Sequence, residues 1–147
     1  MKKELCTLLN VANIMKQLNS NEQSDSYKHI IKTIDYRIFE LCEHRIIDDY
    51  VDIDLDTSCN IKYCSECLLT FNSEFIFSYL QHSLESVDAI ERKLYYNNNI
   101  STIQHYWNQN NKIYFSIILK KQHEILHFDL DKISHIQCDN GLVVIKY

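Results

Sequence analysis

The spacing of apolar residues along this chain changes from one region to the next and predicts a different element in each. Over residues 4–18, apolar side chains recur three and four positions apart, which is typical of an amphipathic helix. A second helix with the same spacing is expected to begin at a cap formed by Ser24 or Asp25 and to end near Glu43. We therefore expect residues 1–44 to form an antiparallel helical hairpin.

The spacing changes to two in residues 49–56, where apolar and acidic residues alternate. The alternating residues are Val51, Ile53 and Leu55 on one side and Asp52, Asp54 and Asp56 on the other. This pattern predicts a half-buried strand with its aspartates in solvent. Turn-forming residues at 56–60 and a short return strand at 61–63 would complete a β-hairpin within residues 45–71.

One more helix is expected after this hairpin. Asn72 or Ser73 can cap it, and its buried side would include Ile90 and Leu94, so that it occupies residues 72–97. Three consecutive asparagines then end the helical pattern.

The last region, residues 100–147, contains short runs of β-branched and aromatic residues, which favour strands. The dipeptide Asn140-Gly141 holds the only glycine of the chain and lies between two such runs, which predicts a two-residue hairpin turn. We expect a small antiparallel sheet here. Because no Pro/Gly-rich linker separates the regions, residues 1–147 are expected to form a single compact α+β domain.

Two pairs of metal-binding residue types flank the predicted β-hairpin. Cys42 and His44 stand at the end of the second helix, and Cys64 and Cys67 follow the return strand after a gap of nineteen residues. Thiolate and imidazole suit Zn²⁺, and structural zinc sites usually take four such ligands in a tetrahedron. Because a hairpin brings its two ends together, the sequence predicts one structural zinc site that staples the β-hairpin to the second helix. The alternative is that these cysteines are small core residues.

Simpler roles are expected for the remaining cysteines and histidines. Cys59 is an alternative ligand, but its place in a turn favours a free thiol. Cys6 and Cys138 fall on apolar faces and are expected to be buried thiols. His123 and His127 are four residues apart, but strands would hold them too far apart to chelate an ion, so these two residues, like His105 and His135, are expected to be surface or core-edge imidazoles.

Several classes of function are disfavoured by the composition. With a single glycine the chain has no P-loop, no dinucleotide-binding GxGxxG and no GxSxG nucleophile elbow. A catalytic zinc ion needs an open coordination position, whereas four ligands can be counted here. The N-terminal stretch is too polar for a signal peptide or a membrane span. We therefore expect a soluble intracellular protein with reduced thiols, without enzymatic activity and without membrane association.

Two surfaces are candidates for partner binding. The first is acidic and comprises Asp48, Asp52, Asp54, Asp56 and Glu66. These residues form either a solvated face that discourages edge-to-edge association or a strip that recruits a basic partner tail or a hard cation, although a strand offers no rigid cage for Ca²⁺. The second contains Tyr106, Trp107, Tyr114 and Phe115 near Lys112, Lys120 and Lys121, and could stack nucleic acid. The formal net charge of −5 disfavours general phosphate binding, so a protein partner is the favoured interpretation.

The composition and one local motif indicate an origin. The chain has 20 Ile, 13 Asn, 12 Lys and 10 Tyr, all encoded by AT-rich codons. Leu41-Cys42-Glu43-His44, the Asp/Ile-rich stretch 48–54 and Tyr63-Cys64-Ser65-Glu66-Cys67 resemble a recurrent zinc-ribbon-like element in uncharacterised proteins of giant double-stranded DNA viruses. The resemblance covers residues 41–67 and implies zinc-ligand roles for the three cysteines and the histidine. Those relatives often carry a proline after the acidic strand, where this chain has Thr57, so a different turn is expected.

These observations give one leading expectation and one alternative. We expect a non-enzymatic viral zinc-binding protein that acts as a protein-interaction or assembly module in the host cytoplasm, the viral factory or the virion. The alternative is a nucleic-acid-associated zinc factor in viral transcription or replication.

Overall fold

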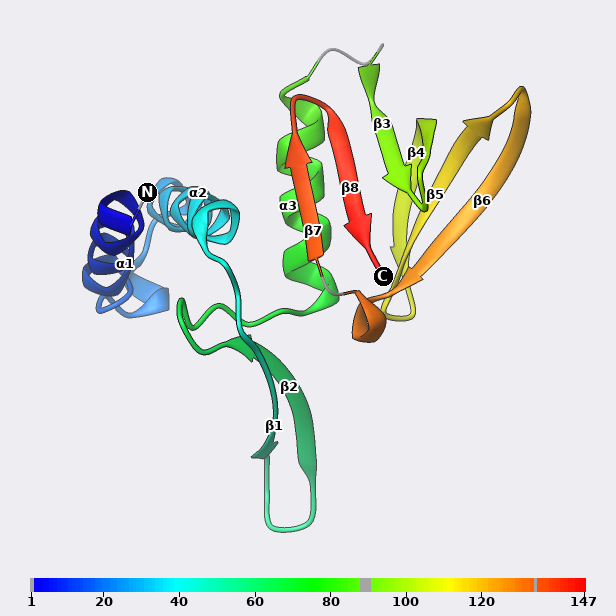
Figure 1. Cartoon of the computed structure of the whole chain (residues 1–147). Coiled ribbons are helices and arrows are strands. Elements are labelled where there is room, and N and C mark those ends of the chain that lie inside the picture. Colours follow the sequence, from blue (N-terminus) through cyan, green and yellow to red (C-terminus); the bar gives the residue numbers. More distant parts are fainter. Residues whose placement is uncertain (1, 88–90, 134) are drawn as a thin grey trace. The chain divides into compact units, whose positions relative to one another are not determined.

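The computed structural model describes residues 2–87, 91–133 and 135–147 (Figure 1). Contacts between Cα atoms divide the chain into two compact units, Met1–Phe71 and Asn72–Tyr147. This boundary coincides with the expected end of the β-hairpin region. The expectation of a single compact domain stays a prediction, and each unit is described by itself.

Unit 1 (residues 1–71) begins with the two expected helices, α1 (Lys2–Met15) and α2 (Asp25–Leu41), joined through a 3-10 turn at Ser20–Glu22. The Ser24 side chain caps α2 by accepting a hydrogen bond from the Tyr27 backbone N–H at 3.2 Å. Arg37 forms an ion pair with Glu4 at 3.0 Å, and the Tyr27 hydroxyl donates to the Met15 carbonyl at 2.8 Å. The start of each helix thus contacts the end of the other, as an antiparallel helical hairpin requires.

The β-hairpin of unit 1 consists of β1 (Ile46–Asp52) and β2 (Ser58–Cys64), paired antiparallel from Ile46↔Cys64 at the base to Asp52↔Ser58 near the tip. The prediction of a half-buried strand was wrong, because all seven β1 side chains are exposed. Residues 53–57 form the connecting loop, so Ile53 and Leu55 lie in the loop and not on the apolar side of a strand. Alternation identified the strand but could not tell whether a second layer covers it.

Unit 2 (residues 72–147) contains the helix α3 (Ser73–Glu85), which Asn72 caps by accepting from the Phe75 backbone N–H at 2.7 Å. A six-stranded sheet follows. Its strands are β3 (Lys93–Tyr96), β4 (Asn99–Gln109), β5 (Lys112–Leu119), β6 (Gln122–Asp129), β7 (His135–Asp139) and β8 (Leu142–Lys146), with a 3-10 turn at Leu130–Lys132. The strand order is β6-β5-β4-β3-β8-β7. The α+β fold class is therefore confirmed.

Two details of unit 2 differ from the sequence-based expectation. The third helix ends at Glu85, and Leu94, expected on its buried side, lies buried on β3. The spacing of Leu94 from the apolar residues before it fits a helix. However, tyrosines at 95–96 favour a strand, and a turn with positive φ at Asn97 and Asn98 joins β3 to β4 in a hairpin. The sheet is mixed, because β8 returns beside β3 and pairs with it in parallel. Ile90 and Ser134 lie outside the described residues.

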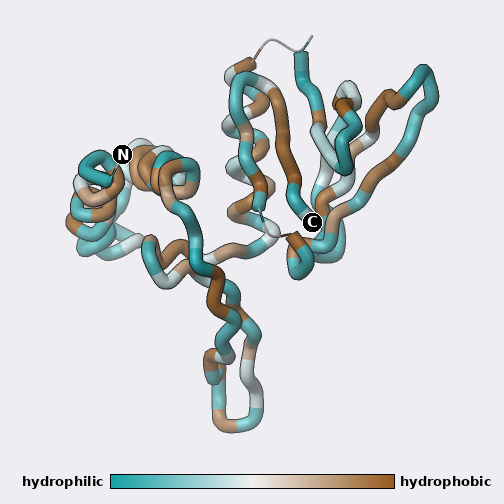
Figure 2. The backbone as a smooth tube through the Cα atoms, in the orientation of Figure 1, coloured by the Kyte–Doolittle hydropathy of each residue, from teal (hydrophilic) through white to brown (hydrophobic). Residues whose placement is uncertain are grey.

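The core of unit 2 lies between α3 and one face of the sheet, where Figure 2 shows apolar backbone colours on both layers. Its largest fully buried side chains are Tyr79, Leu80 and Leu84 from α3 and Leu94, Ile113, Phe115, Ile117, Phe128 and Val143 from the sheet. The buried Tyr79 hydroxyl has polar partners in the backbone of Cys138, whose N–H lies at 3.3 Å and whose carbonyl lies at 3.4 Å. Cys138 is buried as expected, whereas Cys6 in α1 is exposed, contrary to expectation.

Gly141 makes the turn between β7 and β8 possible, as the sequence predicted. Its φ is +80°, and Asn140 before it has a φ of 47°. A Cβ added to Gly141 would lie 2.8 Å from a Val87 methyl carbon and 3.2 Å from the Glu91 carbonyl oxygen. We expect Gly141→Ala to destabilise unit 2 by about 1–3 kcal/mol, through backbone strain and this close contact.

Urea denaturation followed by tyrosine and tryptophan fluorescence measures this change. Asn111→Ala provides a comparison, because Asn111 already carries a Cβ at a turn position with a φ of 59°. If the free energy of unfolding of Gly141→Ala were within about 0.5 kcal/mol of the wild-type value, the turn would tolerate a Cβ and the strain argument would be wrong.

Candidate metal centre

Three elements of unit 1 bring the two ligand pairs together. Cys42 is the C-cap of α2, with its N–H bonded to the Ile38 carbonyl at 3.0 Å, and the chain turns into an extended conformation there. His44 follows two residues later. Cys64 is the last residue of β2, and Cys67 lies in the turn that follows it. The antiparallel pairing of β1 with β2 therefore returns the chain to the end of α2.

The turn after β2 is shaped by hydrogen bonds around Cys64. The Leu68 N–H donates to the Cys64 carbonyl at 2.8 Å, and the Glu66 N–H points to the Cys64 sulfur at 3.4 Å. Leu68 adopts a φ of 61°, which reverses the chain direction. A further bond at 3.0 Å joins the Ser65 N–H to the Arg45 carbonyl and ties this turn to the segment that carries His44.

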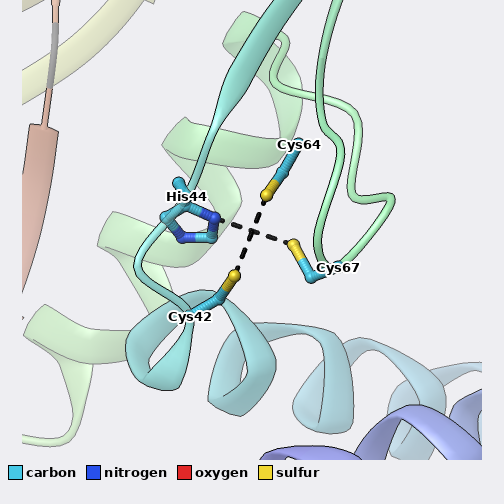
Figure 3. A group of neighbouring side chains, drawn as sticks. All are labelled: Cys42, His44, Cys64 and Cys67. Carbon is cyan, nitrogen blue, oxygen red and sulfur yellow. Dashed lines mark hydrogen bonds between the residues drawn. The ribbon is translucent and has the colours of Figure 1, made fainter.

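The side chains of Cys42, His44, Cys64 and Cys67 point toward one another (Figure 3). Their four candidate ligand atoms all lie within 4.8 Å of one another. The two sulfurs of Cys42 and Cys64 are 3.8 Å apart, and the Cys67 sulfur lies 3.6 Å from His44 Nδ1. The three cysteines are buried and the histidine is half-buried, so the cluster is shielded from bulk water. The arrangement is compatible with one bound metal ion.

The imidazole of His44 is oriented by its surroundings. Its Nε2 lies 2.8 Å from the Phe39 carbonyl oxygen, which can only accept a hydrogen bond. The proton therefore belongs on Nε2, and the lone pair of Nδ1 faces the sulfurs. The ring also contacts Phe39 at a centroid distance of 5.1 Å and the edge-on ring of Phe71 at 4.9 Å. A carbonyl behind a ligating histidine is the usual outer partner of a metal-bound imidazole.

The three thiols differ in their ease of ionisation. Burial raises the pKa of Cys42 and of Cys67, because a buried thiolate loses its hydration. Burial acts in the same direction on Cys64, but hydrogen bonds from the Cys67 backbone, the His44 side chain and the backbones of Glu66 and Arg45 outweigh it and bring the pKa of Cys64 to about 6. One thiolate is thus favoured without an ion, and a divalent cation would favour the other two.

No family model matches the chain, and the comparisons with curated proteins and with solved structures found no match. The site is therefore interpreted from its own geometry. Within the described residues this is the one group of three or more Cys, His, Asp or Glu side chains close enough to hold an ion. His123 and His127 lie on strand β6 and are exposed.

The acidic residues named from the sequence lie on or near the β-hairpin and are exposed. Asp48 lies 3.5 Å from Lys62 across the hairpin, and Glu66 lies 3.9 Å from Arg45. The Asp54 carboxylate accepts hydrogen bonds from the N–H groups of Asp56 and Thr57, each at 2.9 Å. Asp54 thus has a local structural role in the loop. Partner binding by Asp48, Asp52, Asp54, Asp56 and Glu66 stays a prediction.

The aromatic residues proposed for nucleic-acid stacking are divided between the two sheet faces. Phe115 is fully buried, and its cross-strand neighbour Tyr106 contacts Phe77 of α3. Trp107 and Tyr114 are half-buried and lie on the other face, where their rings stack at 5.3 Å and 6°.

The outer surfaces of this ring pair are also occupied. His105 stacks on Trp107 at 5.6 Å, and His127 contacts Tyr114 at 5.8 Å. Each ring of the pair thus has a second ring neighbour on its own sheet face. Lys112 lies 3.4 Å from Asp129, while Lys120 and Lys121 lie in the turn between β5 and β6. These contacts weaken the case for a stacking platform.

Sequence reasoning missed two features of unit 1. The Phe39 carbonyl that orients His44 is a backbone group and carries no sequence signal. The apolar alternation also gives no sign that Val51, Ile53 and Leu55, predicted on the buried side of a strand, are exposed. Among the described residues, no helix combines the length and the apolar character needed to cross a membrane.

Proposed function

We propose that this protein binds one zinc ion in a structural site formed by Cys42, His44, Cys64 and Cys67. The observation that carries the proposal is the spacing of the ligand atoms. A tetrahedral zinc ion, with Zn–S of about 2.3 Å and Zn–N of about 2.0–2.1 Å, requires S···S edges of about 3.8 Å and S···N edges of about 3.6 Å. Two pairs match these edges, because the sulfurs of Cys42 and Cys64 are 3.8 Å apart and the Cys67 sulfur lies 3.6 Å from His44 Nδ1, and all four candidate ligand atoms lie within 4.8 Å of one another.

The composition of the unit 1 interior supports a structural role for the ion. Nine of the described residues 2–71 are buried, and three of them are the cysteines of the site. The others are Ala12, Ile31, Tyr36, Ile38, Phe39 and Leu69. A core this small gives little hydrophobic stabilisation to about 70 residues, and small domains of this kind are commonly held by metals or disulfides. Four protein ligands also leave no open position for a substrate, which supports a non-enzymatic role.

The zinc-stapled unit acts, in this proposal, as a protein-interaction or assembly module. The ion joins the last turn of α2 to the base of the β1–β2 hairpin, so the hairpin is fixed where it leaves the site. All seven β1 side chains are exposed, and several of them are apolar. Exposed apolar surface of this kind is typical of a binding element, since it does not contribute to the core.

We further propose that the protein is viral and acts inside an infected cell, in the cytoplasm, the viral factory or the virion. The AT-rich residue usage and the resemblance of residues 41–67 to the giant-virus element support this origin. The nucleic-acid alternative is not favoured, because the formal net charge is −5, Lys112 lies 3.4 Å from Asp129 and the rings of Trp107 and Tyr114 stack on each other.

Metal analysis of purified full-length protein tests the site. We expect one zinc ion per chain, and cobalt substitution should give the absorption bands of a tetrahedral site with thiolate ligands. His44→Cys is expected to keep one ion per chain with a changed cobalt spectrum, because a fourth thiolate can replace the imidazole. Cys67→Ser should lower zinc affinity at least tenfold.

Two other cysteines supply matched controls. Cys6 and Cys59 are exposed and lie outside the cluster, so Cys6→Ser and Cys59→Ser should retain one ion per chain. Absence of zinc from the wild type, or a loss of zinc from Cys59→Ser equal to that from Cys67→Ser, would contradict the proposed ligand set.

A further inference from the structure

We propose that the tip of the β1–β2 hairpin, comprising Tyr50, Val51, Ile53 and Leu55, docks into an apolar pocket rimmed by Lys and Arg on a partner protein. This inference rests on the interaction role proposed above and names the contact surface and the chemistry of the partner. The argument depends on the exposure, the order and the charge of the tip.

The tip exposes four large apolar side chains to solvent. Leu55 is fully exposed, Tyr50 and Ile53 are each 69% exposed, and Val51 is 46% exposed. Figure 2 shows apolar colours at the end of the hairpin, which is far from the metal site because the site closes the opposite end. Side chains of this size gain about 1.5–3 kcal/mol each on full burial, so a matching pocket would bind them favourably.

The loop that carries Ile53 and Leu55 is held in place by its own hydrogen bonds. The Ile53 N–H donates to the Thr57 carbonyl at 2.9 Å, which closes the loop above the last strand pair. Inside it, the Asp54 carboxylate accepts from Asp56 and Thr57, and the Asp56 bond is the main cause of its lowered pKa. A loop ordered before binding loses less conformational entropy when it docks.

The negative charge of the hairpin favours a partner with a basic surface. Residues 46–64 contain five aspartates and one lysine, so their formal charge is −4 (1 − 5). The lysine, Lys62, already lies near Asp48. An acidic surround repels nucleic acid and anionic lipid, and it accelerates association with a basic protein surface. The combination of an apolar tip and an acidic surround therefore fits a pocket with a rim of Lys and Arg.

Site-specific photo-crosslinking of the zinc-loaded full-length protein identifies the partner. A photoreactive amino acid replaces Leu55 in one variant and Ile125, which is 64% exposed on β6, in the control. Both variants are incubated with an extract of cells that produce the protein naturally and are then irradiated. We expect one or more proteins to be captured at position 55 and not at position 125, with the crosslink mapping to a basic and apolar surface.

The captured protein is then purified and titrated against defined variants. We expect Leu55→Ser to weaken binding about tenfold or more, and Ile125→Ser to leave it unchanged. Asp52→Lys combined with Asp56→Lys should slow association about tenfold and reduce its dependence on salt. Asp54 is left intact, because its carboxylate holds the loop.

Three results would overturn the inference. The first is crosslinking that is equal at positions 55 and 125 or absent at both. The second is binding that does not change with Leu55→Ser or with the charge reversal at Asp52 and Asp56. The third is a dimer in light scattering that depends on Leu55, which would make a second copy of this chain the occupant. Zinc content is measured for every variant. If binding survives Leu55→Ser but is lost on zinc removal, the tip assignment fails and the interaction role stands. If no zinc is bound at all, the proposed site fails independently.

Discussion

Cys64→Ser is expected to unfold unit 1 at ordinary temperatures while unit 2 keeps its structure. The Cys64 side chain is completely buried, and its sulfur is one of the four candidate ligand atoms. Structural zinc contributes about 10–16 kcal/mol of apparent binding free energy in zinc-finger peptides, which is comparable with the whole stability of a small domain, about 5–15 kcal/mol. Limited proteolysis with mass spectrometry should therefore find cleavage throughout residues 2–71 and a protected fragment containing residues 91–133.

Two comparisons isolate the role of the ion. Cys59→Ser changes an exposed thiol on the same strand and should leave both the proteolysis pattern and the melting temperature unchanged. Treatment of the wild type with a strong chelator should reproduce the Cys64→Ser pattern. Identical melting with and without the chelator would contradict a structural metal.

Phe115→Ala is expected to destabilise unit 2 by about 3–5 kcal/mol, because it removes a large aromatic side chain from a packed core. Phe115 is fully buried and contacts the rings of Phe128 and Tyr106 at centroid distances of 5.9 Å and 6.4 Å. Hydrogen exchange under native conditions should show faster exchange over β4, β5 and β6.

The same experiment tests the independence of the two units. Zinc content and protection of α2 should be unaffected by Phe115→Ala if each unit unfolds by itself. Ile125→Ala on the exposed side of β6 serves as a control and should change stability by less than about 0.5 kcal/mol. Loss of zinc from Phe115→Ala would show that the units unfold together and would support a single domain.

The candidate ligands could be found from the sequence because their positions depend on local structure. Cys42 follows a helix whose cap and apolar stripe are both visible, and Cys64 ends a strand that returns from a hairpin. A hairpin joins its two ends whatever its exact length, so the two ligand pairs had to meet. The orientation of His44 depends on a backbone carbonyl and on the ring of Phe71, which is a longer-range contact.

The errors arose where local patterns have two tertiary outcomes. Leu94 continues the helical spacing of α3 and also fits the buried face of β3, and the neighbouring strands β4 and β8 decide in favour of the strand. The alternation in β1 is equally consistent with a covered sheet and with a bare two-stranded ribbon. Parallel pairing of β3 with β8 joins segments almost fifty residues apart, and no spacing in either segment encodes it.

Because the hairpin lies between the two ligand pairs, changes in the sequence of its exposed part should have little effect on the stability of the fold. The candidate metal site lies at the base of the hairpin, where residues 61–63 are half-buried and the Lys62 carbonyl accepts a hydrogen bond from the Phe71 N–H at 2.7 Å, whereas residues 46–60 are all exposed. Lengthening the nineteen-residue excursion by half would cost only about 0.4 kcal/mol in chain closure. We therefore expect the exposed residues 46–60 to tolerate exchange or extension, which would give the chain new binding preferences without rebuilding the scaffold that carries them.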